Sequence, residues 1–371
     1  MCAVEWKKLG DVCEIKTGKG ITTKDCCDNG QYPIISGGVT PMGMYHQFNR
    51  KANTITISRV GANAGFVNFV TQDFYLNDKC FSVIPFDDAI STIDVKYLFF
   101  KLKSIEEEII SLQSEGGVPT INTTKVGNLT IPIPSLAKQQ EIVSQLDTFT
   151  TLISNLESEL DMRRKQYEHY RNQLLDFEGV EKRPLGEICD IIRGNGVQKT
   201  DFTETGVGCI HYGQIYTHYG LFADKTNKFV SNDVALKARK ASKGDIIMTS
   251  TSENVEDICK CVVWCGEDDV AVSAHALILK NSLNPKFIAY CSTTYDFFNQ
   301  KRSLARGAKV VEIKPEQVAK VKIPFPSPNK QQQIVEKLDA FEQLIQSLET
   351  EIKLRKQQYE YYREKLLTFE K

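Results

Sequence analysis

The sequence predicts an α+β protein in which two mixed, strand-rich domains are separated by two long helices. The first supporting observation is a stretch that occurs twice: residues 131–178 recur as 323–370 at a constant offset of 192, and roughly 27 of 48 positions are identical. The second is a heptad pattern in each copy, which is typical of helices that pack on another helix. The third is that the segments before the two copies are also related. Together these features indicate a duplicated structural unit.

The chain begins with a segment that its second half repeats. Residues 6–20 line up with residues 182–196 at an offset of 176, and residues 96–98 match residues 286–288 at an offset of 190. The second globular unit is therefore about sixteen residues longer, and most of the excess falls in its middle. The predicted domains are 1–130 (first globular domain), 131–178 (central repeat helix), 179–322 (second globular domain) and 323–371 (C-terminal repeat helix).

The globular domains are expected to contain many short strands. Runs of β-branched and aromatic residues alternate in them with glycine-rich turns. The strand-like runs include residues 53–58, 66–70 and 245–249, and the turns include residues 36–38 and 61–65. Residues 94–110 and 284–302 have helical patterns.

The repeated stretch has the start and stop signals of a long helix. Residues 137–178 contain no Gly or Pro, Ser135 can cap the start, and Gly179 follows the end. In the second copy Ser327 supplies the cap and Pro328 the first-turn proline. At about 1.5 Å per residue each helix would be roughly 60 Å long. Because heptad helices of this kind do not stay alone, we expect the two copies to pair within one molecule.

The predicted helix seam advances by alternate steps of four and three residues. It comprises Ile142, Leu146, Phe149, Ile153, Leu156, Leu160, Tyr167, Leu174, Ile334, Leu338, Phe341, Ile345, Leu348, Ile352, Tyr359 and Leu366. Arg163 and Arg355 occupy equivalent seam positions among apolar neighbours. Each arginine either extends its charged end out of the seam or fixes the register of the helices at a cost in stability.

Composition places the chain among soluble proteins of two or more domains. It has 371 residues, of which 41% are hydrophobic and 25% charged. No run of about 18 apolar residues exists and the start does not resemble a signal peptide, so we expect a cytoplasmic protein without membrane contact. The 11 Cys residues, including the adjacent pair Cys26-Cys27, lack the regular spacing of a secreted disulfide scaffold. We expect them to be reduced thiols in the core.

Charge is distributed unevenly between helices and globular domains. The net charge is −1; the two helical copies together carry −3, which leaves +2 for the remainder. The helices are therefore not expected to form a nucleic-acid surface. Basic residues gather instead at Lys16, Lys19, Lys24, Arg50, Lys51 and Arg59 in the first half, and at Lys301, Arg302, Arg306, Lys309, Lys314, Lys320 and Lys322 in the second. An ordinary solvated surface is the alternative explanation for any one of them.

A search for catalytic and metal sites finds no adequate candidate. No phosphate-binding Gly-x-x-x-x-Gly-Lys-Ser/Thr loop is present. Residues 284–287 resemble a methyltransferase motif only loosely and are better interpreted as a helix start, and Glu312 matches Thr120 in the other repeat, which argues against a nuclease site. In residues 258–265 alternate cysteines are expected on one face of a strand, and His211 and His218 have no diagnostic zinc spacing. We therefore expect no metal and no cofactor in this chain.

The motif at the helix entry resembles a known family. Both copies read Ile-Pro-x-Pro followed by Gln-Gln-x-Ile-Val-x-x-Leu-Asp, and residues 117–122 lead into residues 129–134 before the first helix. This order of globule, helix, globule and helix is similar to the specificity subunit of Type I restriction-modification systems. The resemblance covers essentially the full chain.

The resemblance implies an architecture and a function. Each globule would be a target-recognition domain for one half of a split, asymmetric double-stranded DNA sequence. The helices would form an intramolecular antiparallel coiled coil with pseudo-twofold symmetry, set the unspecified spacer, and dock two methyltransferase (modification) subunits. Restriction/translocase subunits would join the full complex, and this chain would be non-catalytic. A coiled-coil scaffold protein without DNA readout and a self-contained methyltransferase or nuclease are the alternatives.

Side-chain chemistry nominates candidate DNA contacts in glycine-bounded loops. Arg and Lys suit guanine edges and phosphates, Asn and Gln suit adenine, and Ser or Thr can serve either. The candidates are Lys16, Lys19, Ser36, Arg59, Asn63, Arg193, Asn195, Lys199, Tyr212, Gln214, Ser250 and Arg306. For each of them a plain surface role is the alternative.

Overall fold

The computed structural model describes residues 4–114, 117–177, 179–281, 283–307 and 309–370. The chain divides into two compact units, one formed by residues 1–158 with 349–371 and the other by residues 159–348. Each unit therefore contains one globular domain and a part of each of the two long helices, α5 (Leu136–Leu175) and α12 (Pro328–Leu367), which have 40 residues each. The four-part division predicted from the repeats stays a proposal. Within the described ranges, none of the helices is both long and apolar enough to cross a membrane.

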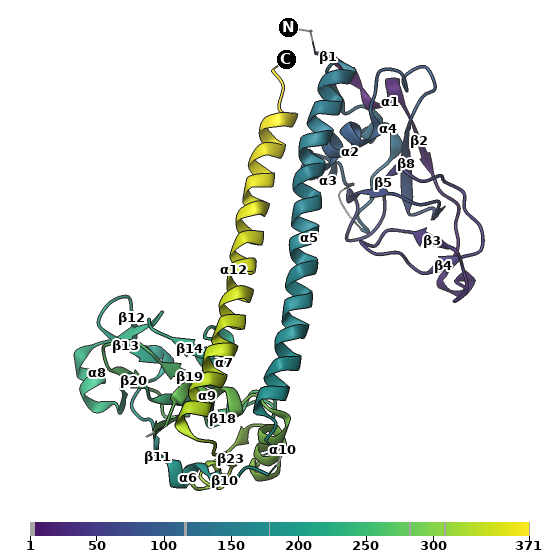
Figure 1. Cartoon of the computed structure of the whole chain (residues 1–371). Helices are drawn as coiled ribbons and strands as arrows, with labels where there is room; N and C mark the ends of the chain where they lie inside the picture. The colour runs from purple at the N-terminus through teal and green to yellow at the C-terminus, as the bar shows by residue number, and fades with distance from the viewer. Residues whose placement is uncertain (1–3, 115–116, 178, 282, 308, 371) are drawn as a thin grey trace. The chain divides into compact units, whose positions relative to one another are not determined.

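The first globular domain consists of short strands and helices (Figure 1). Its strands are β1 (Glu5–Lys8), β2 (Cys13–Thr17), β3 (Tyr32–Ile35), β4 (Met44–Tyr45), β5 (Thr54–Ser58), β6 (Val67–Val70), β7 (Tyr75–Leu76), β8 (Cys80–Pro85) and β9 (Thr130–Ile133). Its helices are α1 (Leu9–Val12), α2 (Val95–Ser104), α3 (Glu106–Ser111) and α4 (Thr123–Gly127), with a 3-10 turn η1 (Thr23–Asp25).

The second globular domain has a similar but longer series of elements. Its strands are β10 (Lys182–Pro184), β11 (Cys189–Arg193), β12 (Phe202–Thr203), β13 (Val207–Ile210), β14 (Phe222–Ala223), β15 (Phe229–Val230), β16 (Lys240–Ala241), β17 (Ile246–Thr249), β18 (Thr251–Ser252), β19 (Cys261–Trp264), β20 (Val270–Val272), β21 (Ala276–Asn281), β22 (Val311–Glu312) and β23 (Lys322–Pro324). Its helices are α6 (Leu185–Ile188), α7 (Tyr212–Thr217), α8 (Asn232–Lys237), α9 (Pro285–Cys291), α10 (Tyr295–Leu304) and α11 (Pro315–Val318), with a 3-10 turn η2 (Lys199–Asp201).

The sheets of the two domains share one topology. The order β2-β8-β5-β6 in the first corresponds to β11-β21-β17-β19 in the second, which adds β14 at its edge. A second sheet contains the parallel pair β3-β7 in the first domain and the parallel pair β13-β20 in the other. The first strand of each domain pairs antiparallel with the Ile-Pro strand that leads into the long helix, β1 with β9 and β10 with β23. The prediction of two related, mixed, strand-rich domains is confirmed.

Two predicted helices are each divided in the structure. The stretch 94–110 forms α2 and α3, because Ile105 between them leaves helical geometry (φ −110°, ψ 24°). The stretch 284–302 forms α9 and α10, with a new cap at Thr294, whose hydroxyl accepts from the N–H of Phe297 at 3.3 Å. The interpretation of Asn284 as a helix start is correct, because its side chain accepts from the first N–H groups of α9.

A buried glutamine fixes the start of each long helix. The Gln139 amide donates to the carbonyls of Pro134 and Thr92, both at 2.8 Å, and its oxygen accepts from the N–H of Asp94 at 2.8 Å. Gln331 donates to the carbonyl of Pro326 at 2.9 Å in the second unit. Both side chains are almost fully buried, which gives the first glutamine of the repeated Gln-Gln motif a structural role. The first helix ends at Leu175, and Glu178 lies outside the described residues.

The long helices pack antiparallel within each unit. In the first unit Leu367 lies in one cluster with Ile142 and Leu146, and further along α5 the ring of Phe149 stacks on Tyr362 at 5.4 Å. In the second unit Tyr170 of α5 stacks on Phe341 of α12 at 5.4 Å. Residue numbers thus fall along α12 as they rise along α5, so the predicted intramolecular antiparallel pair is confirmed.

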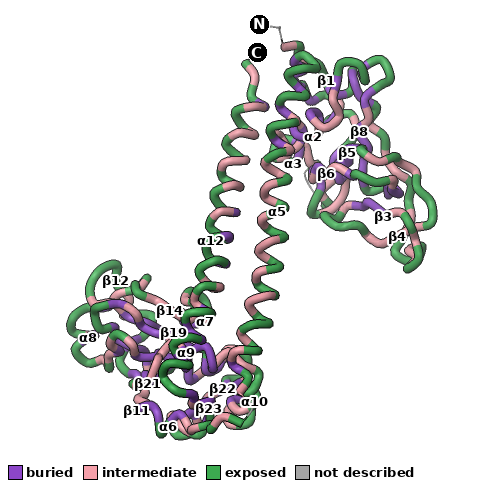
Figure 2. The backbone as a smooth tube through the Cα atoms, viewed as in Figure 1, coloured by how far each residue is buried: buried purple, intermediate pink, exposed green. Residues whose placement is uncertain are grey.

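The seam residues of the long helices differ in how deeply they are buried. Figure 2 shows that buried residues concentrate in the strands, while the long helices carry mostly half-buried and exposed residues. The buried seam residues are Ile142, Leu146, Ile334, Leu338, Ile345, Leu348 and Ile352. The half-buried ones are Phe149, Ile153, Leu156, Leu160, Tyr167, Leu174, Phe341, Tyr359 and Leu366. Arg163 and Arg355 contact acidic and glutamine side chains of their own helices, so both guanidinium groups leave the seam.

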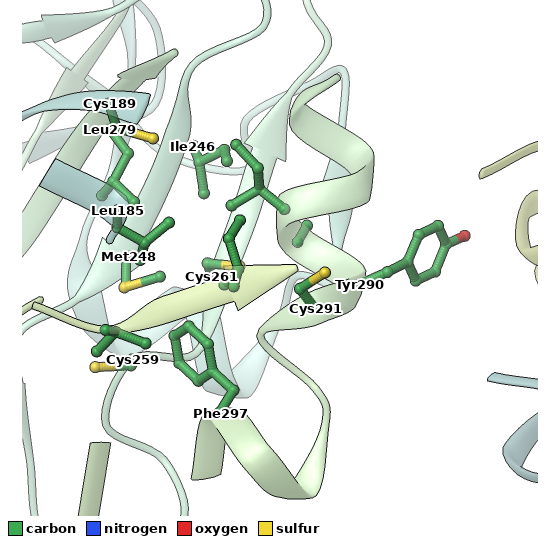
Figure 3. Close-up of a cluster of buried hydrophobic side chains, with 14 of the residues drawn as sticks. Leu185, Cys189, Ile246, Met248, Cys259, Cys261, Leu279, Tyr290, Cys291 and Phe297 are labelled. Atoms are coloured by element: carbon green, nitrogen blue, oxygen red, sulfur yellow. The ribbon is translucent and has the colours of Figure 1, made fainter. Parts of the chain in front are cut away.

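The cysteines pack mainly as apolar side chains. Figure 3 shows Cys189, Cys259, Cys261 and Cys291 among the apolar side chains of the second unit's core. The prediction that Cys259 lies on a strand is wrong, because β19 begins at Cys261 and Cys259 has a left-handed backbone (φ 60°). Cys26 and Cys27 are half-buried in a loop rather than in a core. In the described part of the chain, no group of three His, Cys, Asp or Glu side chains is arranged to hold a metal.

Candidate nucleic-acid interface

The same backbone hydrogen bonds recur at one edge of each globular domain. In the first domain the N–H of Arg59 donates to the carbonyl of Lys79 at 2.8 Å. In the second the N–H of Ser250 donates to the carbonyl of His275 at 3.0 Å. The first pair lies between the end of β5 and the start of β8, and the second between the end of β17 and the start of β21. Arg59 and Ser250 therefore occupy one structural position, and Lys79 and His275 another.

Further bonds extend this correspondence to neighbouring loops. The N–H of Lys19 donates to the carbonyl of Leu76 at 3.0 Å, and that of Asn195 donates to Val272 at 3.1 Å. The N–H of Asn77 likewise donates to the carbonyl of Ile35, and the N–H of Ser273 donates to the carbonyl of Ile210. We call the two regions the loop edges: residues 18–20, 36–38, 59–65 and 77–79 in the first domain, and residues 194–196, 211–213, 250–259 and 273–275 in the second.

The first loop edge brings together most of the candidates predicted in that domain. It carries Lys19, Ser36, Arg59 and Asn63. Lys19 and Asn63 are exposed, whereas Ser36 is buried. Lys16 lies further back on β2, where its ammonium pairs with Glu14 at 3.3 Å. Among the described residues no carboxylate pairs with Lys19, so its ammonium is less engaged than that of Lys16.

Arg59 and Ser250 share an unusual property. The Arg59 Nη1 donates to the carbonyl of Asp78 at 3.1 Å, but its Nε is buried without a hydrogen-bond partner. The Ser250 hydroxyl is also buried and unpartnered. Among the residues that the structure describes, only one other buried side-chain nitrogen or oxygen, Arg171 Nε, lacks a partner. An unpaired buried polar atom costs about 1–3 kcal/mol, and each domain carries one at this shared position.

The second loop edge holds several candidates in internal hydrogen bonds. Arg193 donates to the carbonyl of Ala274 at 2.9 Å and pairs with Glu312 at 2.8 Å. Asn195 uses both ends of its amide on the backbone, donating to Lys237 at 3.1 Å and accepting from the Arg239 N–H at 2.5 Å. These two residues shape the loops, and their polar groups are mostly occupied.

The remaining second-domain candidates differ in their exposure and in the hydrogen bonds that they make within the protein. The ring of Tyr212 lies against His275 (5.1 Å between centroids) and is half-buried. Gln214 accepts from the His211 N–H at 2.7 Å and also bonds Asn227. Lys199 is exposed in η2. Arg306 is exposed, and its Nη1 donates to the carbonyls of residues 303 and 305.

His211 stays neutral at the second loop edge. Its Nδ1 accepts from the N–H of Gly213 at 3.2 Å and so caps α7, while its ring is buried beside Tyr212. Burial lowers the pKa of His211 to about 4, and the positive charges of Lys199 and His275 add to this effect. The position corresponds to Ser36 in the first domain, so a neutral capping side chain occupies it where a serine stands in the other repeat.

Sequence reasoning missed Lys79, His275 and Thr251. Lys79 and His275 are exposed on the loop edges, and the Nδ1 of His275 lies 3.0 Å from the Thr251 hydroxyl. The repeat offset is 196 between Lys79 and His275 but 176 at the start of the domains. Insertions between these points hide the correspondence in the sequence, and a lone Lys or His outside a glycine-rich loop gave no signal.

Corresponding positions carry different chemistry on the two edges. The first edge presents Lys19, Arg59 and Lys79, and the second presents Asn195, Ser250 and His275 at the same places. Lys and Arg side chains suit phosphates and guanine edges, whereas amide, hydroxyl and imidazole groups suit other base edges. One scaffold therefore displays two chemically different loop edges.

Comparisons with known proteins agree with this arrangement. Residues 3–162 and 177–355 match the Type I restriction modification DNA specificity domain. The Escherichia coli Type I restriction enzyme EcoR124I/EcoR124II specificity subunit is 30% identical over 405 residues, which cover 99% of this chain and 95% of that protein. A Methanocaldococcus jannaschii protein, the Type I restriction enzyme MjaVIII specificity subunit, is 22% identical over 92% of this chain and 87% of its own length.

Solved structures show the same fold. The crystal structure of the Type I restriction-modification system S subunit from M. genitalium aligns with a TM-score of 0.67 at 18% identity, covering 100% of this chain and 97% of that chain. A structure concerning complex assembly and conformational transition of the type I R-M system aligns with a TM-score of 0.58 at 18% identity, covering 99% and 98%. With two matched domains over most of its length, this chain belongs to the family of Type I restriction-modification specificity subunits.

Proposed function

We propose that this chain is the DNA sequence-specificity subunit of a Type I restriction-modification complex. Each globular domain reads one half of a bipartite target, and the helix pair sets the spacer and docks two methyltransferase subunits. The observation that carries the proposal is the loop edge, which is built twice with the same backbone bonds and with different side chains. That is the arrangement needed to recognise two unlike half-sites with one fold.

Assignment as a specificity subunit also implies that this chain is non-catalytic and that its partners are methyltransferase and restriction subunits. A relative named as the specificity subunit of a restriction enzyme supports a division of labour in which other subunits methylate and cleave. Recognition by this chain needs polar and cationic side chains but no cofactor. We place the assembled complex in the cytoplasm, on double-stranded DNA.

A coiled-coil scaffold without DNA readout is the alternative that the sequence left open. It would need the helix pair but not two differing loop edges with unpartnered polar atoms at one shared position. The family membership also favours DNA recognition over scaffolding. A scaffold would show no sequence-specific DNA affinity even when bound to its partners.

The decisive experiment maps methylated adenines in cells that contain the cognate methyltransferase subunit, with and without this chain. A bipartite motif should appear only when the chain is present. Arg59→Ala should relax only the first half of that motif, and Ser250→Ala only the second, because the two residues occupy the same position in different domains. Equal loss of methylation at every target variant with Arg59→Ala would make Arg59 a phosphate contact instead.

A further inference from the structure

The segments that follow α3 in the first domain and α10 in the second share a backbone hydrogen bond. The N–H of Ser114 donates to the carbonyl of Thr120, and the N–H of Arg306 donates to that of Glu312, each at 2.9 Å. Both pairs are related by the offset of 192, so residues 110–122 and 302–314 can be compared position by position. We call residues 302–307 and 309–314 the flank loop.

The flank loop carries cations where the first domain has none. Its exposed basic residues are Arg302, Arg306, Lys309 and Lys314. The corresponding residues of the first domain are Ile110, Ser114, Gly117 and Asn122. Because the first domain forms the same backbone bonds with uncharged side chains, the fold itself does not require these cations.

The flank loop is fixed beside the second loop edge. The N–H of Ile313 donates to the carbonyl of Ser250 at 3.0 Å, and β18 pairs with β22 at Thr251 and Glu312. The Glu312 carboxylate pairs with Arg193 at the end of β11 at 2.8 Å. The amide of Gln317 donates to the carbonyl of Leu304 at 2.7 Å. These bonds hold the loop in place without using its basic side chains.

No carboxylate among the described residues neutralises the basic side chains of the flank loop. Among the described residues, no carboxylate pairs with Arg302, Lys309 or Lys314, and the carboxylate of Glu312 is taken by Arg193. Arg306 donates only to backbone carbonyls, so its charge also remains unpaired. The first domain shows the opposite distribution, with Lys19, Arg59 and Lys79 on the loop edge itself and uncharged residues at the positions of the flank-loop cations.

We propose that the flank loop binds the DNA phosphate backbone next to the second half-site. It supplies affinity there without reading sequence, while amide, hydroxyl and imidazole side chains of the second loop edge contact the bases. The first domain lacks this clamp and obtains both affinity and readout from cations on its loop edge. The physical basis is that phosphate contacts position a protein on DNA but carry no sequence information, whereas contacts to base edges do. This proposal rests on the proposed function.

The test measures DNA affinity of the complete complex with its methyltransferase subunits over a series of salt concentrations. The duplex contains the methylated motif, and the variant is Lys309→Gln combined with Lys314→Gln. The matched control is Lys225→Gln combined with Lys228→Gln, two exposed lysines between β14 and β15 of the same domain. The binding constant falls as salt rises, and each lost phosphate contact makes the negative slope of log K against log salt shallower by about 0.9. The slope for the double variant should therefore be shallower than that of the wild type by about 1.8. The control should match the wild type, and the methylated motif should stay the same in both.

Three results would overturn the proposal while leaving the proposed function intact. An unchanged slope in the flank-loop variant would show that no phosphates are bound there. A relaxed second half-site in the methylation map would make these lysines base contacts. Loss of a methyltransferase subunit, measured as mass of the complex, would make the loop a protein interface. If the wild-type complex bound no DNA sequence preferentially, the proposed function itself would fail.

Discussion

Replacement of Lys301 by Met should disturb recognition of the second half-site and leave the first intact. Lys301 lies on α10, is almost fully buried, and donates to the carbonyls of Glu256 at 2.9 Å and Ile258 at 2.7 Å. These carbonyls belong to the 250–259 segment of the second loop edge. The buried ammonium therefore holds in place the loop that follows Ser250.

The two hydrogen bonds of Lys301 set the expected loss of unfolding free energy. A hydrogen bond from a charged donor contributes about 1.5–3 kcal/mol, and each carbonyl left buried without a donor costs about 1–3 kcal/mol. Relief of the desolvation that lowers the pKa of Lys301 offsets part of this loss. We expect the second unit to lose about 2–4 kcal/mol. Lys301→Gln should recover part of the loss, because an amide can still donate to one carbonyl.

The first domain offers a matched control for the same role. There the Gln113 amide donates to the carbonyl of Ala64 at 2.7 Å, and Ala64 corresponds to Ile258. Gln113→Leu should therefore relax only the first half of the methylated motif, and Lys301→Met only the second. The assay is adenine methylation mapping in cells, together with thermal unfolding of each purified complex. If both variants weakened both halves equally, the assignment of these donors to separate loop edges would be refuted.

Three further predictions concern stability. Between pH 7 and pH 4, His211 should contribute about 3 kcal/mol of destabilisation to the second unit, because its pKa falls from 6.5 to about 4 on burial, so it stays neutral in the fold but takes up a proton on unfolding. Melts of His211→Asn, which keeps a capping side chain, should lack this contribution. Arg163→Leu combined with Arg355→Leu should raise the melting temperature and leave the spacer of the methylated motif unchanged, because the guanidinium groups bond side chains of their own helices; a changed spacer would restore the register role. Gln139→Ala should lower the unfolding free energy by about 2–4 kcal/mol, because its side chain makes three hydrogen bonds in a buried site; a loss below about 1 kcal/mol in denaturant melts would contradict this.

Much of the architecture could be predicted because its signals are local. Heptad spacing, capping residues and an ungapped repeat predicted α5 and α12, and Asn284 was identified as a helix start for the same reason. Such features depend on residues a few positions apart, which the sequence displays directly. The breaks at Ile105 and Thr294 were missed, since apolar spacing continues across them while the backbone does not.

The candidate site was predicted less completely. Glycine-bounded loops led to Lys19, Arg59, Asn63 and Ser250, which the fold brings to equivalent edges. Lys16 was nominated on the same basis but lies back along β2 in an ion pair with Glu14. Residue type indicates which bonds a side chain can form, but not whether a neighbour has already formed them.

The sequence by itself determined that the molecule is duplicated, that its two long helices pair, and that the segments between them have diverged. Only the tertiary structure decided that Arg59 corresponds to Ser250 and Lys79 to His275, at offsets of 191 and 196. The physical reason is that strand pairing restores equivalence across insertions of different length, because backbone hydrogen bonds depend on position in the sheet and not on distance along the chain. The same sheet geometry buried Ser250 without a partner and placed the cations of the flank loop beside it.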